Sequence, residues 1–237
     1  MSRIDLIVRS DLKWSVRTRQ VASMFELEAK PSTEEWSFDL DLPEEWSIGL
    51  IVGASGSGKT TIARHLFDDL FLDELKWPKD GTVIDGFDKS VSIKDVCGAL
   101  SSVGFSSPPS WLRPYDVLSN GEKFRADVAR ALVADQKTIA IDEFTSVVDR
   151  TVAQIGSAAV SKAVRRSDKR LIAVSCHYDI VEWLQPDWVL HMPDGRLDRR
   201  LVQSRPAIEL EVFRVEGAEW HRFRRHHYLD PSLARSA

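Results

Sequence analysis

The stretch Gly53-Ala54-Ser55-Gly56-Ser57-Gly58-Lys59-Thr60 decides the fold of this chain. It fits the pattern G-x-x-x-x-G-K-[S/T] and lies between an apolar run at 47–53 and a segment at 59–72 whose apolar residues share one helical face. Glycines let the backbone curl until its N–H groups point inward, and the start of the following helix adds partial positive charge. The combination predicts a loop that binds the phosphates of a nucleotide.

The side chains that follow the glycines complete the predicted phosphate site. Lys59 brings a full positive charge to the β- and γ-phosphates, and the hydroxyl of Thr60 is a ligand for Mg²⁺. The alternative is a glycine-rich turn that contains a lysine by chance, and the flanking strand and helix disfavour it. The candidate nucleotide-binding residues here are Gly53, Ala54, Ser55, Gly56, Ser57, Gly58, Lys59, Thr60 and Thr61.

A second apolar run, 138–141, ends in two carboxylates, Asp142 and Glu143. No fold needs paired acids at the end of a buried strand, where they would repel each other and lose hydration. A metal ion and a polyphosphate beside the glycine-rich loop would explain both. We therefore predict that Asp142 helps to hold Mg²⁺, directly or through water, and that Glu143 polarises the attacking water.

The composition limits the remaining choices. The chain has 237 residues, 43% of them hydrophobic and 29% charged, enough for one large domain or one domain with an appendage. No stretch approaches the ~18–20 consecutive apolar residues that span a bilayer. The start shows no secretory signal, and two cysteines are too few for a disulfide framework. We therefore expect a soluble, cytoplasmic protein with no membrane insertion.

Apolar strands alternate with helical patterns, which predicts an α/β fold with a mostly parallel sheet and right-handed crossovers. The segments 4–9, 12–29 and 36–42 instead alternate apolar and polar residues and are expected to form antiparallel strands. The periodicity changes near residue 200, which predicts a domain over 1–200 and an extension over 201–237. The other predicted strands are 47–53, 138–141, 171–175 and 187–192, the predicted helices are 59–72, 122–134, 149–166 and 178–185, and 104–118 is the predicted loop.

Another motif, Leu118-Ser119-Asn120-Gly121-Glu122-Lys123, opens the helical pattern that continues to Leu132. Ser119 is a plausible N-cap, and Glu122 three residues later would form a capping box. By itself this is only a well-capped helix. Its place after the phosphate loop and about twenty residues before the acidic strand resembles the signature of the ATP-binding-cassette (ABC) ATPase family, where LSGGQ replaces LSNGE.

The resemblance implies a P-loop NTPase fold, ATP and Mg²⁺ as ligands, and hydrolysis of ATP. In that family the signature of one subunit caps the ATP held by the other subunit, so Ser119 and Gly121 would act on the partner's nucleotide in a homodimer. The segment 146–149 resembles the family's D-loop, and His177 occupies the position of its switch histidine, which bonds the γ-phosphate. The candidate catalytic residues are then Glu143, His177 and Lys59.

The chain also departs from the family pattern. No glutamine lies between Lys59 and Ser119, and the equivalent place, 104–107, offers only Ser106 or Ser107 as a substitute. Only 60 residues separate Lys59 from Ser119, so we expect a shortened helical subdomain. For the aromatic residue that stacks on adenine, position favours Phe25, with Trp36 as the alternative; both are also reasonable core residues.

The predicted extension bears on what the ATPase drives. The residues from 196 onward include nine arginines and six acids. Within them, the segment 220–229 interleaves aromatic and basic side chains, as in surfaces that bind DNA or RNA. The alternative is that this segment only packs onto the sheet of the ATPase domain. Metal binding by His221, His226 and His227 lacks clear ligand spacing. The segment also loosely resembles one in bacterial and phage ABC ATPases associated with acetyltransferase-like domains, and the resemblance implies that such a partner is a separate chain or was removed.

Taken together, these features favour a role in nucleic-acid processing or modification over a membrane transporter's ATP-binding subunit. The missing glutamine and the shortened helical part argue against transport, because both normally receive the membrane subunit.

Overall fold

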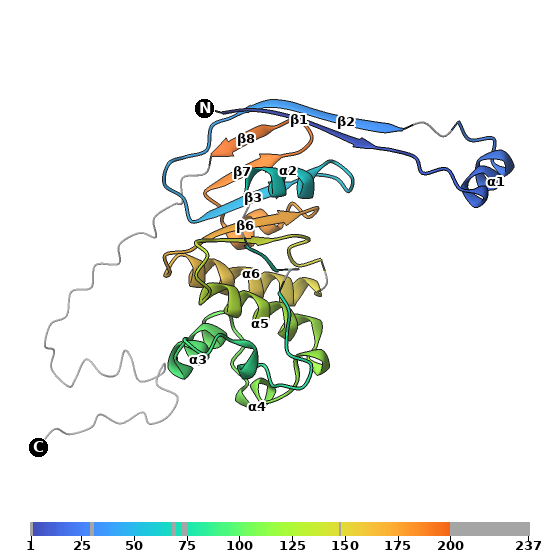
Figure 1. Cartoon of the computed structure of the whole chain (residues 1–237). Helices are drawn as coiled ribbons and strands as arrows, with labels where there is room; N and C mark the ends of the chain where they lie inside the picture. Colours follow the sequence, from blue (N-terminus) through green and yellow to red (C-terminus); the bar gives the residue numbers. More distant parts are fainter. Residues whose placement is uncertain (1, 29–30, 68–69, 73–74, 147, 200–237) are drawn as a thin grey trace, which may run out of the picture. The chain divides into compact units, whose positions relative to one another are not determined.

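A six-stranded sheet organises the part of the chain that the computed structural model describes, which is residues 2–28, 31–67, 70–72, 75–146 and 148–199 (Figure 1). Its order is β4–β5–β6–β3–β7–β8, and every neighbouring pair is parallel except β7 with β8. The strands are β3 (Ile48–Val52), β4 (Leu70–Phe71), β5 (Thr138–Ile141), β6 (Arg170–Ser175), β7 (Trp188–His191) and β8 (Arg196–Arg199). The mostly parallel α/β fold predicted from the sequence is confirmed.

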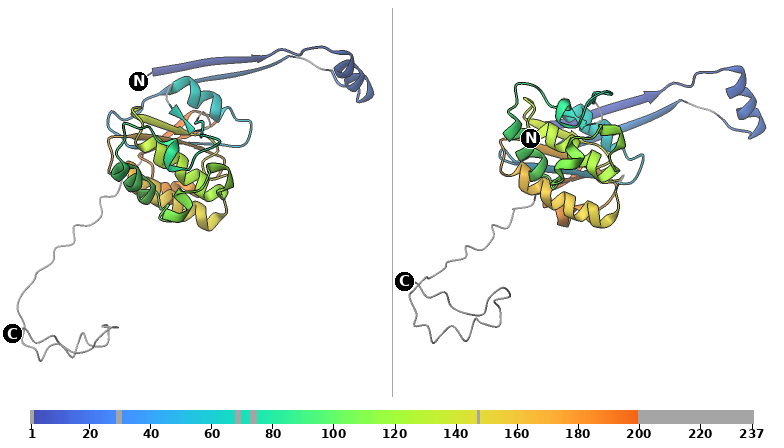
Figure 2. Two further views of the ribbon diagram at one scale, coloured as in Figure 1. Left: turned by 60° about the horizontal axis from the view of Figure 1, so that its bottom comes forward. Right: turned by 90° about the horizontal axis from the view of Figure 1, so that it is seen from below.

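Side chains of the inner strands alternate between two cores because successive residues of a strand point to opposite faces. In β3, Ile48, Leu50 and Val52 face one core and Ile51 faces the other. The first core is covered by α3 (Ile93–Ser102), α5 (Asn120–Leu132), α6 (Arg150–Val164) and α7 (Ile180–Leu184), with α4 (Pro108–Trp111) beside them (Figures 1 and 2). The second is covered by α2 (Lys59–Leu66) and by residues of the N-terminal ribbon.

The N-terminal ribbon pairs β1 (Ser2–Ser10) with β2 (Ser32–Leu40) in antiparallel register. At one end Ile4, Trp36 and Leu40 are buried, and the pairing finishes at Ser10 with Ser32. The predicted antiparallel part is therefore confirmed for 4–9 and 36–40.

The strand predicted over 12–29 is wrong, because α1 (Val16–Met24) occupies this segment. Ser15 caps it: the Ser15 Oγ accepts from the Thr18 amide at 3.2 Å, and the Ser15 amide donates to Thr18 Oγ1 at 2.7 Å. This local capping box satisfies backbone donors that a strand would need a partner strand to satisfy. No residue of α1 is buried, so the apolar residues behind the alternating pattern are not core residues.

Two other predicted elements also change. The helix predicted over 59–72 ends at Leu66, because Leu70 and Phe71 pair with Ile139 and Ala140 as the edge strand β4. The loop predicted over 104–118 contains α4 and a short 3-10 turn, Tyr115–Val117. The strand predicted over 36–42 begins four residues earlier, at Ser32, and ends at Leu40, and the remaining predicted helices and strands are present within one to two residues of their expected bounds.

The chain divides into two units, Met1–Val202 and Gln203–Ala237. The second unit lies outside the described residues, and so does the segment 220–229 for which nucleic-acid binding was predicted. In the described ranges no helix has the length and apolar character needed to cross a membrane.

Candidate nucleotide-binding and hydrolysis site

The glycine-rich loop connects buried strand β3 to helix α2, as the sequence predicts. Gly56 and Gly58 adopt left-handed backbone conformations, with φ of 77° and 85°, which glycine reaches without a steric penalty. The Ser57 amide donates to the Ala54 carbonyl at 3.2 Å and tightens the turn. Lys59 folds back over it, with Nζ 2.7 Å from the Ala54 carbonyl oxygen. The ammonium group of Lys59 is therefore hydrogen-bonded to the backbone of the loop itself.

The loop has free polar groups and room for a phosphate. Ser57 Oγ is buried and has no hydrogen-bond partner within the described residues, and a buried hydroxyl without a partner is unfavourable. A side chain placed on Gly56 would meet nothing within 4 Å. The first turn of α2 contains no acidic residue, so its positive end is not neutralised locally. These features fit a bound anion.

The ring of Trp36 packs directly against the loop. A Cβ built on Gly58 would lie 2.2 Å from Trp36 Cζ2, and Trp36 is only 7% exposed. Phe25, chosen by position as the adenine-stacking residue, instead caps the C-terminal end of α1 and is 68% exposed. The structure therefore brings Trp36 to the phosphate loop and does not bring Phe25 there. The reason is that Phe25 lies at the C-terminal end of helix α1, outside the paired strands of the ribbon.

Replacing Gly58 with Ala is expected to lower the free energy of unfolding by about 3 kcal/mol, from left-handed backbone strain plus overpacking against Trp36. Gly56→Ala is the matched control, because it has the same backbone strain but open space, and should lose about 1 kcal/mol. Urea unfolding checks both. Equal losses, or an unchanged loss for Gly58→Ala in a Trp36→Ala background, would contradict this packing.

The two predicted acids follow β5 directly. Glu143 has φ of 49°, an uncommon conformation for a non-glycine residue that is often found at functional sites. The Glu143 amide donates to Asp142 Oδ1 at 2.9 Å, and Ser146 Oγ donates to Glu143 Oε2 at 3.3 Å. The Phe144 amide donates to the Val174 carbonyl at 2.8 Å, which fastens this turn to β6. The acids are thus held by local bonds, with Asp142 half-buried and Glu143 exposed.

Strands β5, β6 and β3 are consecutive in the sheet, so their carboxyl ends lie at one edge. Asp142 and Glu143 follow β5, His177 follows β6, and the phosphate loop follows β3. The His177 amide donates to Ser175 Oγ at 3.1 Å, and its ring is exposed. Within the described residues no cluster of three His, Cys, Asp or Glu side chains could hold a metal alone. Thr60 and Asp142 would therefore need the phosphates to complete the shell of a Mg²⁺ ion.

The predicted signature forms the start of α5, and its capping box is present. Glu122 donates its amide to Ser119 Oγ at 3.3 Å, and Glu122 Oε2 accepts from the Ser119 amide at 3.0 Å and from its hydroxyl at 2.9 Å. The bond from the Ser119 amide is the main cause that lowers the pKa of Glu122. Ser119 is exposed and Gly121 is half-buried. The capping box therefore fixes this helix end through bonds within the chain itself.

A hollow of about 270 Å³ joins the start of α5 to Asp142 and Glu143 of the same chain. Asn120 and Lys123 line it together with Asp142 and Glu143, whereas none of the loop residues 53–60 does. Asp127 also lines it, and this residue is not among the site residues predicted from the sequence. The only signal was an acid placed between the apolar residues Ala126 and Val128 of a helix.

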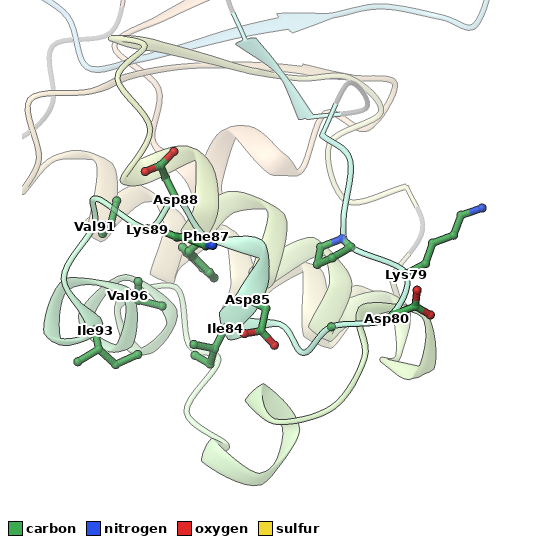
Figure 3. Close-up of a pocket in the computed structure, with 12 residues that line it drawn as sticks. Lys79, Asp80, Ile84, Asp85, Phe87, Asp88, Lys89, Val91, Ile93 and Val96 are labelled. Carbon is green, nitrogen blue, oxygen red and sulfur yellow. The ribbon is translucent and has the colours of Figure 1, made fainter.

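Another hollow, of about 620 Å³, lies over α3 and the segment before it (Figure 3). Three carboxylates and two lysines line it beside apolar side chains, and Asp85 and Asp88 already accept bonds from Thr82 and Ser90. An excess of acid disfavours a polyphosphate. We therefore assign the nucleotide to the loop and not to this hollow.

The structure also bears on the glutamine that the ABC family has between the phosphate loop and the signature and that this sequence lacks between Lys59 and Ser119. The strand beside β5 is β4, whereas residues 104–107 connect α3 to α4 in the helical layer. Ser107 begins α4, and its hydroxyl accepts from Ser110 at 3.2 Å. The described residues next to the strand that precedes Asp142 and Glu143 are therefore those of β4 and β6, and residues 104–107 are not beside it.

No protein-family model matches this chain, and no curated protein matches it. Solved structures do match. The dimeric structure of MJ0796, a bacterial ABC transporter cassette, aligns with a TM-score of 0.57 and 15% identity over 73% of this chain and 94% of that one. The post-hydrolysis state of MJ0796 bound to ADP and Pi aligns with a TM-score of 0.54 and 16% identity over 70% and 92%.

A bacterial Atm1-family ABC exporter with ATP bound aligns with a TM-score of 0.50 and 23% identity over 65% of this chain and 33% of that one. At these identities the likeness concerns the fold. The chain has the fold of an ABC cassette, as the order of its motifs predicted.

Proposed function

We propose that this chain is an ABC-type ATPase that binds Mg·ATP and hydrolyses its β–γ phosphoanhydride bond. The observation that carries the proposal is the single sheet edge that gathers the phosphate loop, Asp142 with Glu143, and His177 from three consecutive strands. A fold alone hosts many activities, so the site and not the fold supports the reaction.

Each residue then has a defined role. Loop amides and Lys59 bind the phosphates, and Lys59 leaves its intrachain bond to Ala54 to do so. Thr60 and Asp142 would hold Mg²⁺, which when bound neutralises charge that develops on the phosphates. Glu143 accepts a proton from the attacking water, and His177 donates a bond to the γ-phosphate. The products are ADP and phosphate.

Lys59→Ala is expected to weaken ATP binding about 10- to 100-fold, because a hydrogen bond to a charged group contributes about 1.5–3 kcal/mol. Lys79→Ala, which removes an exposed lysine from the hollow of Figure 3, should bind ATP like the wild type. Titration with a fluorescent ATP analogue measures both. Equal affinity for the wild type and the Lys59 variant would remove the loop from the nucleotide site.

The working unit in this proposal is a homodimer, in which Ser119 and Gly121 of one subunit approach the ATP of the other. The start of α5 supports it, because the capping box fixes this helix tip and leaves Ser119 exposed to a partner subunit. Two of the structural neighbours are dimeric cassettes by their descriptions.

What hydrolysis drives is inferred from the sequence. We favour a nucleic-acid partner, bound through Arg222, Arg224 and Arg225, or a separate acetyltransferase-like chain. The second candidate is the ATP-binding subunit of a membrane transporter, and the similarity of this fold to that of MJ0796 favours it. Hydrolysis measured with and without DNA or RNA at physiological salt separates them, since stimulation that depends on these arginines supports only the first.

A further inference from the structure

We propose that Asp127 is a positioning residue for ATP hydrolysis. It fastens the side chains of Trp77 and Tyr115 to helix α5, and so fixes the wall of the hollow that Asp142 and Glu143 line. The inference rests on the proposed ATPase function. It assigns a role to residues that lie outside the phosphate loop, the signature motif and the acidic strand.

Both oxygens of the Asp127 carboxylate accept bonds from aromatic side chains. Trp77 Nε1 donates to Oδ1 at 2.7 Å, and the Tyr115 hydroxyl donates to Oδ2 at 2.7 Å. The two rings stack on each other, with centroids 4.6 Å apart and an angle of 8° between their planes. One carboxylate therefore fixes two side chains that come from segments on either side of α3 and α4 in the sequence.

Cations from the same helix hold the outer sides of this ring pair. The Arg130 guanidinium lies 5.0 Å from the centre of the Trp77 ring, and its Nη1 donates to the Lys76 carbonyl at 2.8 Å. The Lys123 ammonium lies 5.6 Å from the centre of the Tyr115 ring. Lys123, Asp127 and Arg130 lie four and three residues apart, which places them on one face of α5. This face of α5 therefore contacts the backbone carbonyl of Lys76 and the side chain of Trp77.

This cluster is continuous with the catalytic edge. Tyr115, Lys123 and Asp127 line the 270 Å³ hollow that Asp142 and Glu143 also line. Leu72, which directly follows β4, lines it too, and β4 pairs with the catalytic strand β5. Asp127 therefore holds Tyr115, which lines the same hollow as the acids, and Trp77, which comes five positions after Leu72 in the sequence.

The electrostatic surroundings agree with a positioning role. Burial raises the pKa of Asp127 to about 6, against the opposing effects of the bonds from Tyr115 and Trp77 and the charges of Arg130 and Lys123. Burial, together with the nearby Asp127 charge, also raises the pKa of Tyr115, which keeps its hydroxyl protonated and able to donate. A partly buried carboxylate is weak evidence for stability, and fixing one arrangement is a better-attested use.

A second indole in the helical layer offers a matched control. Trp111 is buried, and its Nε1 donates to the Phe105 carbonyl at 2.9 Å, a bond like that of Trp77. Neither tryptophan lines the hollow, but Trp77 bonds to Asp127, which does line it, whereas Trp111 bonds to Phe105, which does not. Trp77→Phe and Trp111→Phe each remove one indole donor and keep an aromatic ring, so they differ mainly in where the lost bond lies.

The test measures kcat, the KM for ATP and the urea unfolding midpoint for the full chain. Trp77→Phe is expected to lower kcat about tenfold with KM within about twofold, because small misplacements at a reacting centre reduce rate more than binding. Trp111→Phe should lower the urea midpoint by a similar amount and leave kcat unchanged. Asp127→Ala should lose at least as much kcat as Trp77→Phe.

Asp127→Asn is expected to restore kcat to within about twofold of the wild type. Its amide oxygen accepts from Trp77, and its amide nitrogen donates to the Tyr115 oxygen. Equal loss of kcat in the two tryptophan variants, or wild-type kcat in Asp127→Ala, would overturn the positioning role while leaving the ATPase intact. Absence of hydrolysis in the wild-type chain would instead overturn the proposed function, and this role with it.

Discussion

Glu143→Gln is expected to lower the rate of ATP hydrolysis about 10²- to 10⁴-fold, the usual contribution of a general base, with ATP affinity within a few-fold of the wild type. Glutamine has the volume of glutamate and can keep the bond from Ser146, but it cannot accept a proton from water. The loss should therefore fall on the chemical step. Single-turnover hydrolysis and equilibrium ATP binding measure the two effects separately.

The control for this variant is Glu182→Gln, a change to an exposed acid in the first turn of α7. It should hydrolyse ATP like the wild type. Because Glu143→Gln blocks hydrolysis after nucleotide binding, the variant should also accumulate as a dimer with Mg·ATP during size-exclusion chromatography. A wild-type hydrolysis rate in Glu143→Gln would remove this residue as the base and return the choice to other groups at the sheet edge.

The sequence predicted those features of the site that depend on a local pattern. The phosphate loop needs two left-handed glycines between a strand and a helix, and the acidic strand ends in Asp142 and Glu143; each is a continuous stretch. The capping box at Ser119 is likewise complete within four residues. The carboxyl ends of parallel strands meet at one edge by topology, so the assembly of these stretches followed from the α/β pattern.

Features set by contacts between distant segments were missed. The strand β4 is only two residues long, and its pairing with β5, not its own pattern, makes it a strand. Residues 16–24 belong to the segment predicted as a strand but have no partner strand, and a local cap makes them a helix. Asp127 binds Trp77 across 50 positions, a distance that no sequence window covers.

Mixing two inactive variants is expected to restore activity if the site is shared between subunits. Lys59→Ala disables the phosphate loop, and Gly121→Asp places a negative charge at the helix tip that would face the γ-phosphate. The Cβ of the new residue would lie 3.2 Å from Val152 Cγ1, a contact that a small shift of that methyl relieves. Each variant alone should lose about 100-fold or more of the hydrolysis rate because of like-charge repulsion or the lost cation.

In a 1:1 mixture about half of the twofold-symmetric dimers contain one chain of each kind. One of the two sites in such a dimer combines an intact Lys59 with an intact Gly121, provided that the signature acts on the partner's nucleotide. The mixture should then recover about a quarter of the wild-type hydrolysis rate. If the signature acted on its own chain's nucleotide, every site would lack one of the two residues and no activity would return.

The mixture of Lys59→Ala with Glu143→Gln provides the control. Both residues follow strands of one sheet edge, so they serve the same site of one chain, and mixed dimers retain no complete site. Recovery in the first mixture and none in the second can arise only if Gly121 crosses to the partner while Lys59 and Glu143 stay together. Recovery in both would show that these residues do not share a site, which contradicts the arrangement of β3 and β5.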